Sequence, residues 1–111
     1  HAAKAQQLGI EGAPEYLCPA DIEPVLARKM HRLALRAHRV LGALDVSRVD
    51  IRLDNEDKPR LIEINPLPGL TPGYSDLCIQ AAADGIAYED LILEILYLAA
   101  GRWGMIAPRD I

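Results

Sequence analysis

Two short stretches in the middle of the chain alternate apolar and polar residues, and they limit the fold more than any other feature. Residues 48–53 read RVDIRL and residues 61–65 read LIEIN, with the turn-forming segment NEDKP between them at 55–59. A period of two is typical of β-strands. A polar turn between two such runs predicts an antiparallel β-hairpin.

The apolar residues set the register of the predicted hairpin. Four β-branched residues gather on one face when the strands pair as follows: Val49 with Ile64, and Ile51 with Ile62. A slip of one residue would mix this apolar set with the polar set. The register therefore places Asp50 opposite Glu63 on the other face, and it places Arg48 opposite Asn65.

This polar face has two interpretations, since two carboxylates that oppose each other need compensation. One is an internal salt-bridge network, because Arg48 and Arg52 flank Asp50 on the same face. The other is a divalent cation held between Asp50, Glu63 and Asn65, whose oxygen donors suit Mg²⁺. Arg48 would then neutralise phosphate charge beside the cation. The residues alone leave both interpretations open.

The second strand runs into a loop with the sequence PLPGL at 66–70. Pro66 and Pro68 stiffen the backbone, and Gly69 allows a ligand to approach the chain closely. The backbone N–H of Gly69 is a candidate donor to a developing oxyanion. A rigid turn selected only for packing fits this sequence equally well.

A long amphipathic helix is expected before the hairpin, over residues 20–44. Asp21 is the expected N-cap, and Gly42 is expected to end the helix. One apolar stripe recurs at three- and four-residue spacing, formed by Leu26, Met30, Leu33, Ala37, Val40 and Leu44. The basic residues of this segment fall largely outside the stripe and are expected to face solvent.

Two further helices are expected after the loop. Ser75 is the expected cap of a short helix over 76–84. Residues 88–101 predict a helix that is apolar on most sides, and therefore buried, with Gly101 closing it. Together with the hairpin, these helices predict an α+β fold in a single domain over residues 1–111, with a loop-like lead-in over 1–20.

Composition excludes several classes of function. Half of the 111 residues are hydrophobic and the net charge is −4, which favours a soluble globular protein and argues against a nucleic-acid surface. No run approaches the roughly 20 apolar residues that a membrane span needs. Cys18 and Cys78 are expected to be free, buried thiols in a reducing cytoplasm, with a disulfide between them as the alternative. Because the chain opens at His1 without an initiator methionine, we expect it to be part of a longer or processed protein.

Four segments occur in an order known from one enzyme family: YLCPA at 16–20, SRVDIRLD at 47–54, LIEINPLPGLT at 61–71 and GIAYEDLI at 85–92. With these segments, residues 14–100 resemble the D-alanine–D-alanine ligases of the ATP-grasp superfamily. The resemblance implies that Mg-ATP phosphorylates the carboxylate of one D-alanine. The amine of a second D-alanine then attacks the acylphosphate.

The resemblance also implies roles for individual residues. Asp50, Glu63 and Asn65 match the family's ligands for Mg²⁺ (or Mn²⁺), and Glu63 and Asn65 thereby contact the nucleotide. Arg48 would stabilise the transferring phosphate and the tetrahedral intermediate. Gly69 would contribute a backbone donor.

The sequence departs from the family pattern in the loop. The family's serine that binds the substrate carboxylate falls on Tyr74, and Ser75 comes one residue late. Either the loop shifts by one residue to bring Ser75 into place, or the second amino acid is not D-alanine. We adopt the shift as the working interpretation.

The family's N-terminal domain and its central ATP-binding lobe have no counterpart in these 111 residues. The resemblance therefore implies the C-terminal catalytic segment of a cytoplasmic ligase of peptidoglycan precursor synthesis, inactive alone. Its partners would be ATP, a small amino acid and the rest of its own ATP-grasp chain, with a homodimer as one option. The alternatives are a ligase with a different acceptor amino acid, and a stand-alone module that only binds.

Overall fold

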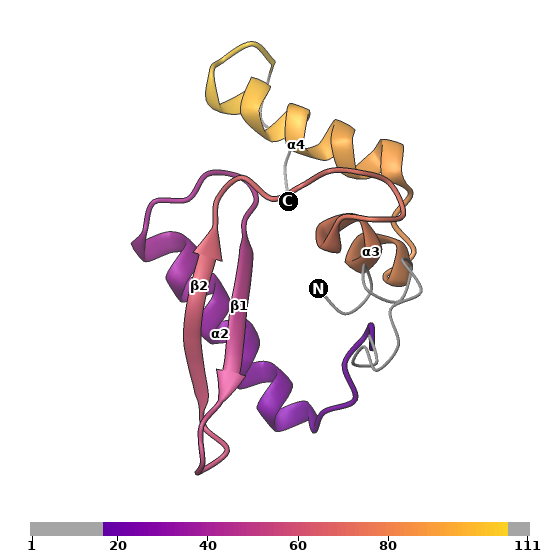
Figure 1. Cartoon of the computed structure of the whole chain (residues 1–111). Coiled ribbons are helices and arrows are strands. Elements are labelled where there is room, and N and C mark those ends of the chain that lie inside the picture. Colours follow the sequence, from indigo (N-terminus) through magenta and orange to yellow (C-terminus); the bar gives the residue numbers. More distant parts are fainter. Residues whose placement is uncertain (1–16, 107–111) are drawn as a thin grey trace.

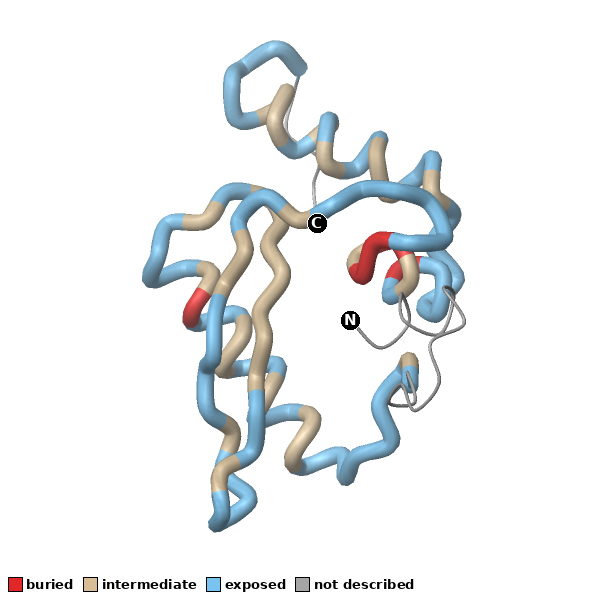
Figure 2. The backbone as a smooth tube through the Cα atoms, viewed as in Figure 1, coloured by how far each residue is buried: buried red, intermediate tan, exposed pale blue. Residues whose placement is uncertain are grey.

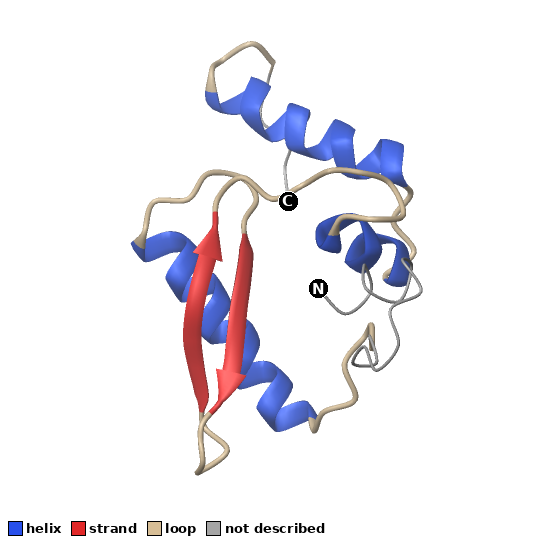
Figure 3. Ribbon diagram, in the orientation of Figure 1, coloured by secondary structure: helices blue, strands red, loops and turns tan. Residues whose placement is uncertain are grey.

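A computed structural model describes residues 17–106 of the chain. Its elements follow in the order α2 (Pro24–Val40), β1 (Arg48–Leu53), β2 (Pro59–Asn65), α3 (Asp76–Ala83) and α4 (Tyr88–Arg102) (Figure 1, Figure 3). The expected mixture of helices with a two-stranded antiparallel sheet is confirmed. The lead-in expected over 1–20 is described only from Leu17 onward, where the chain reaches α2 without a helix or strand.

The register of the hairpin is confirmed at one end and wrong at the other. Val49 pairs with Ile64 and Asp50 pairs with Glu63, as the apolar pattern predicts. Beyond this point a β-bulge shifts the register, so that Ile51 pairs with Leu61 and not with Ile62. A bulge leaves one residue of the longer strand without a direct partner. The bulge therefore divides the hairpin into a part that keeps the expected register and a part near the turn that does not.

Helix α2 packs along the hairpin, which needs such a partner because an isolated two-stranded sheet is marginal in water (Figure 1). The first four residues of the expected stripe are at least partly buried: Leu26, Met30, Leu33 and Ala37. The last two are not, since Val40 is 76% exposed and Leu44 61%. The helix ends at Val40, and Gly42 follows it with a φ of +67°. The stripe therefore contributes to the core only as far as the helix continues.

The expected N-cap of α2 is wrong. The helix begins at Pro24, so the N-cap position belongs to Glu23 and not to Asp21. The fixed φ of proline suits the first helical residue, and the cap is then the residue directly before it. Glu23 makes no side-chain capping hydrogen bond.

Helices α3 and α4 pack against each other beside the hairpin layer (Figure 1). Their expected positions are confirmed. Ser75 occupies the N-cap position of α3, but it makes no side-chain capping hydrogen bond. Gly101 does not close α4, because the helix continues to Arg102 and the left-handed residue is Gly104, with a φ of +71°.

The expected burial of α4 is wrong for this chain. Leu93 and Leu96 are 59% and 62% exposed, and no residue of α4 is buried (Figure 2). Its apolar residues occur on most sides, but among the described elements α3 is the main neighbour of the helix. One helix can cover only one side of another, so the remaining apolar surface faces outward.

The buried part of the described chain is small. Its buried residues are Ala37, Cys78, Ala81, Ser75 and Asp76, and no large side chain between residues 17 and 106 is fully enclosed. Both cysteines are free thiols, as expected. The expected burial is confirmed for Cys78 and wrong for Cys18, which is half-buried. No helix in the described range is long and apolar enough to cross a bilayer.

Candidate functional site

Four of the seven expected site residues meet at the open end of the hairpin, where β1 begins at Arg48 and β2 ends at Asn65. Arg48 pairs with Asn65, and Asp50 pairs with Glu63 on the neighbouring strand. This end lies before the β-bulge, so the register that the apolar residues predict holds here. The four polar residues are therefore neighbours because the apolar face of the hairpin fixes their positions.

Arg48 binds three carboxylates with three nitrogen atoms. Its Nε and Nη2 donate to the two oxygens of Asp50 over 3.0 and 3.1 Å. Nη2 also donates to Glu63 Oε1 over 3.2 Å, and Nη1 donates to Asp76 Oδ2 over 3.5 Å. We call these four residues the Arg48 cluster. The hydrogen bonds to Asp50 raise the pKa of the Arg48 guanidinium above its ordinary value, against the opposing effect of burial.

The four side chains of the Arg48 cluster differ in their exposure to solvent. The side chain of Asp76 is 7% exposed, that of Arg48 27%, that of Asp50 39% and that of Glu63 60%. Three carboxylates around one guanidinium leave an excess of negative charge. The two more exposed acids, Asp50 and Glu63, are those that a cation from solvent would reach first.

The salt-bridge interpretation of the polar face is confirmed in part. Arg48 forms the network, but Arg52 does not, because within residues 17–106 the basic residue that pairs with Asp50 is Arg48. Arg52 lies beyond the bulge, opposite Arg60. The network around Asp50 therefore forms with Arg48 and not with Arg52.

The oxygen donors are of the kind that binds a divalent cation. In this structure, however, their carboxylates are bonded to Arg48. Asp50 and Glu63 present carboxylates from neighbouring strands, and Asn65 adds a carboxamide oxygen, all hard ligands that suit Mg²⁺. Residues 17–106 contain no group of three or more His, Cys, Asp and Glu side chains that could hold a metal ion. A cation at this place would have two carboxylate ligands, both bonded to Arg48 in this structure. The metal assignment therefore stays a prediction.

The loop after β2 is held by side chains at several points. Asn65 Oδ1 accepts a hydrogen bond from the N–H of Leu67 over 3.0 Å, and Tyr88 on α4 donates to the carbonyl of Leu70 over 2.8 Å. The side chain of Asn65 therefore orders the loop while one lone pair of its oxygen remains for another partner. Within the part of the chain that the structure describes, no hydrogen bond from the N–H of Gly69 is seen.

Ser75 and Tyr74 have different environments. Ser75 is 5% exposed, and its Oγ accepts a hydrogen bond from the N–H of Thr71 over 2.8 Å. A Cβ on Gly69 would lie 2.8 Å from this oxygen, so glycine is needed where the loop passes Ser75. Tyr74 is 40% exposed. Which of the two binds substrate stays a prediction.

Sequence reasoning missed Asp76 as a member of the cluster. An acid in the first turn of a helix is usually explained by the helix dipole, and nothing in the sequence relates it to an arginine 28 residues earlier. It also missed the ion pair of Asp45 with Arg102, which joins the segment before β1 to the end of α4.

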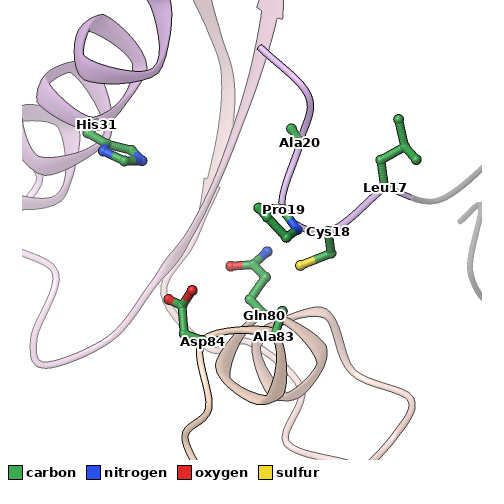
Figure 4. Close-up of a pocket in the computed structure, with 8 residues that line it drawn as sticks. All are labelled: Leu17, Cys18, Pro19, Ala20, His31, Gln80, Ala83 and Asp84. Carbon is green, nitrogen blue, oxygen red and sulfur yellow. The ribbon is translucent and has the colours of Figure 1, made fainter. Parts of the chain in front are cut away.

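A separate hollow of about 380 Å³ lies between the lead-in segment, α2 and the end of α3 (Figure 4). Its lining residues are Leu17, Cys18, Pro19, Ala20, His31, Gln80, Ala83 and Asp84. His31 faces the hollow from α2, opposite Gln80 and Asp84 of the α3 side (Figure 4). None of the expected site residues lines it.

Comparison with known proteins identifies the family. Residues 4–97 match the model of the D-ala D-ala ligase C-terminus. The chain belongs to this family. Among curated proteins, D-alanine–D-alanine ligases from Cupriavidus metallidurans and Erythrobacter litoralis are 41% and 42% identical to it, over 85 and 92 residues. One from Maridesulfovibrio salexigens is 40% identical over 90 residues.

These matches cover 77–80% of this chain and 26–28% of the relatives. The chain therefore spans about a quarter of the length of the curated relatives that it matches.

Proposed function

We propose that this segment is the catalytic C-terminal part of an ATP-dependent ligase that joins the carboxylate of D-alanine to the amine of a second amino acid. The observation that carries the proposal is the Arg48 cluster, built on paired strands in a member of this family. Its relatives are named D-alanine–D-alanine ligases. We place the enzyme in the cytoplasm, in the synthesis of a peptidoglycan precursor.

The reaction has two steps. A carboxylate oxygen of the first D-alanine attacks the γ-phosphorus of ATP, the bond to the bridging oxygen breaks, and ADP leaves. The amine nitrogen of the second substrate then attacks the acyl carbon of the acylphosphate. The tetrahedral intermediate collapses, inorganic phosphate leaves, and the nitrogen loses a proton, so that one amide bond forms for each ATP consumed.

The residues of the open end have complementary roles in these steps. Asp50, Glu63 and Asn65 would hold Mg²⁺ or Mn²⁺, which supplies charge neutralisation on the phosphate oxygens of ATP. Arg48 lies beside these three residues and would donate to the negative charge that develops on the transferring phosphate. The N–H of Gly69 is available to bind the oxyanion of the tetrahedral intermediate.

The experiment that tests the proposal uses the full gene product that carries these residues. With ATP, Mg²⁺ and D-alanine, it is expected to release ADP and phosphate in equal amounts. Hydroxylamine added in place of the second amino acid is expected to trap the acylphosphate as D-alanine hydroxamate. D-alanine-dependent release of ADP without any hydroxamate would contradict the acylphosphate step, and no ADP release would contradict the function.

Residues 1–111 alone are expected to be inactive. The chain spans about a quarter of its relatives, and α4 exposes apolar surface that nothing in the described range covers. Equal turnover by the isolated segment and by the full gene product would contradict this expectation.

A ligase with a different acceptor amino acid is the second candidate. It is favoured by the loop, because the side chain of Ser75 is buried against Gly69 while Tyr74 is more exposed. A panel of second amino acids, assayed with D-alanine as the first substrate, distinguishes the candidates by kcat/KM. A preference for D-alanine of tenfold or more over every other acceptor would exclude the second candidate, and a preference for another acceptor would support it.

A further inference from the structure

Asp76 is a buried acid in contact with the residue that we assign to phosphate stabilisation. It is the first residue of α3 and is 7% exposed, and its Oδ2 lies 3.5 Å from Nη1 of Arg48. Burial of a carboxylate is costly unless charge or hydrogen bonds compensate for it. The positive end of α3 and the guanidinium of Arg48 both provide such compensation. The contact also joins the hairpin to α3 across 28 residues of sequence.

Arg48 and a cation would compete for the same two acids. Nη2 of Arg48 donates to both Asp50 and Glu63 in this structure. When these carboxylates turn to a cation, the guanidinium loses acceptors and stands beside a second positive charge. An arginine with no other acceptor would then be repelled from the place where it is needed.

Asp76 offers the acceptor that the other two acids cannot. It lies on α3 and not on the hairpin, it is less exposed than Asp50 or Glu63, and it contacts a different nitrogen of Arg48. Its bond to Nη1 can therefore persist while Nη2 releases Glu63. Outer partners that orient a catalytic group in this way commonly change affinity or rate by about 10–100-fold when they are removed.

We infer that Asp76 is a positioning residue, which holds Arg48 beside the metal ligands once Asp50 and Glu63 bind the cation. This inference rests on the proposed function, because it assumes that those two carboxylates bind a divalent ion with the nucleotide. It assigns to α3 a part in the phosphate site that the family motifs on the hairpin and loop do not include.

The test is Asp76→Asn in the full gene product, with Asp45→Asn as the matched control. Asp45 also forms a side-chain ion pair from the segment before β1 to the C-terminal helices, with Arg102. Binding of Mn²⁺ to the protein with ADP is followed by the electron paramagnetic resonance signal of free Mn²⁺. In Asp76→Asn we expect about tenfold weaker Mn²⁺ binding and about tenfold lower kcat, with KM for ATP within about twofold. The control is expected to keep all three values.

A double-mutant cycle separates positioning from the simple loss of a negative charge. In an Arg48→Gln background there is no guanidinium to hold, so Asp76→Asn is expected to leave Mn²⁺ binding unchanged. An undiminished effect in that background would overturn the inference in favour of a field effect. Asp76→Ser provides a second, smaller variant if Asp76→Asn does not fold, with the same expected results.

The remaining outcomes are equally decisive. Wild-type values in Asp76→Asn would overturn the inference while the proposed function stands. An equal loss in Asp45→Asn, with an equal fall in Tm, would assign both residues to structure and overturn it as well. If the wild-type protein with ADP binds no Mn²⁺ and releases no ADP from ATP, the proposed function fails, and the inference fails with it.

Discussion

Both ends of the β1–β2 hairpin combine acidic side chains with hydrogen-bond donors, but in opposite ratios. At the turn end, Asp54 accepts hydrogen bonds from the N–H groups of Glu56 and Lys58 and from Nε of Arg60, over 2.8, 3.0 and 2.8 Å. At the open end, one guanidinium faces three carboxylates. One acid is surrounded by donors at the turn, whereas one donor group is surrounded by acids at the open end.

The ratio of donors to carboxylates explains what each end can do. The oxygens of Asp54 accept hydrogen bonds from the backbone and from Arg60, so the negative charge of Asp54 is compensated. The Arg48 cluster retains an excess of negative charge, and two of its acids are open to solvent. We therefore expect a cation to bind at the open end and not at the turn, and the predictions below test this difference.

The largest expected effect follows removal of a proposed metal ligand at the open end. Asp50→Asn or Glu63→Gln in the full gene product is expected to lower the rate of D-alanine-dependent ADP release by about a thousandfold. Charge neutralisation by a metal ion is worth several kcal/mol in a transition state. Asp54→Asn, at the turn end, is the matched control and is expected to keep the rate within about twofold. Equal losses at both ends would show that the hairpin only needs its acids for folding.

The second prediction concerns the geometry of the two arginines. Arg48→Lys keeps the charge but cannot bond to three carboxylates with a planar fork, so we expect kcat to fall about a hundredfold. Arg60→Lys is the control, because Arg60 makes one exposed ion pair with Asp54. Steady-state assays of ADP release measure both. A kcat for Arg48→Lys within threefold of wild type would show that charge alone is sufficient.

The third prediction concerns the loop that leaves the open end. In Gly69→Ala the new Cβ would lie 2.8 Å from Ser75 Oγ, so we expect a loss of about 1–3 kcal/mol in the free energy of unfolding. Gly101→Ala is the matched control, because its Cβ would meet nothing within 4 Å in α4. Alanine is the better helix former by up to about 1 kcal/mol, so this control is expected to be neutral or stabilising. Thermal denaturation of the full gene product measures both, and equal stability changes would contradict the close approach at Gly69.

The open end of the hairpin was predictable because one simple pattern determines it. The alternation around Asp50 and Glu63 fixes which residues oppose each other, and this register holds up to the bulge. Nothing in the alternation indicates the bulge itself, so the predicted pairing of Ile51 with Ile62 was wrong. A local pattern predicts a register only while each strand contributes one residue per pair.

The contacts that join separate elements were not predictable from patterns within one element. The acid of Asp76 and the pair of Asp45 with Arg102 depend on how α3 and α4 lie against the hairpin layer. The prediction that α4 is buried was wrong for a related reason. An apolar sequence indicates that a helix needs neighbours, but it does not indicate whether these 111 residues supply them. Its exposed Leu93 and Leu96 are the result.

The smallest expected effect is a pH dependence at the turn end. The hydrogen bond from the backbone of Lys58, followed by that from Arg60, lowers the pKa of Asp54 below its ordinary value of 3.8. A carboxyl whose pKa is lower in the folded protein stabilises the fold above its unfolded pKa, and this contribution is lost as pH falls through the folded pKa. Wild type is therefore expected to exceed Asp54→Asn in Tm at pH 6, and this difference is expected to shrink as pH falls below 3.8 and through the lower folded pKa.

Glu56→Gln is the control for this measurement, because its ion pair with Lys58 is more exposed than that of Asp54 with Arg60. Its Tm is expected to follow that of wild type at every pH. A Tm difference for Asp54→Asn that persists unchanged to pH 2.5 would show that the carboxylate charge does not stabilise the turn. The comparison between the two ends would then rest on the open end alone, because only there would the charge of an acid have a measurable role.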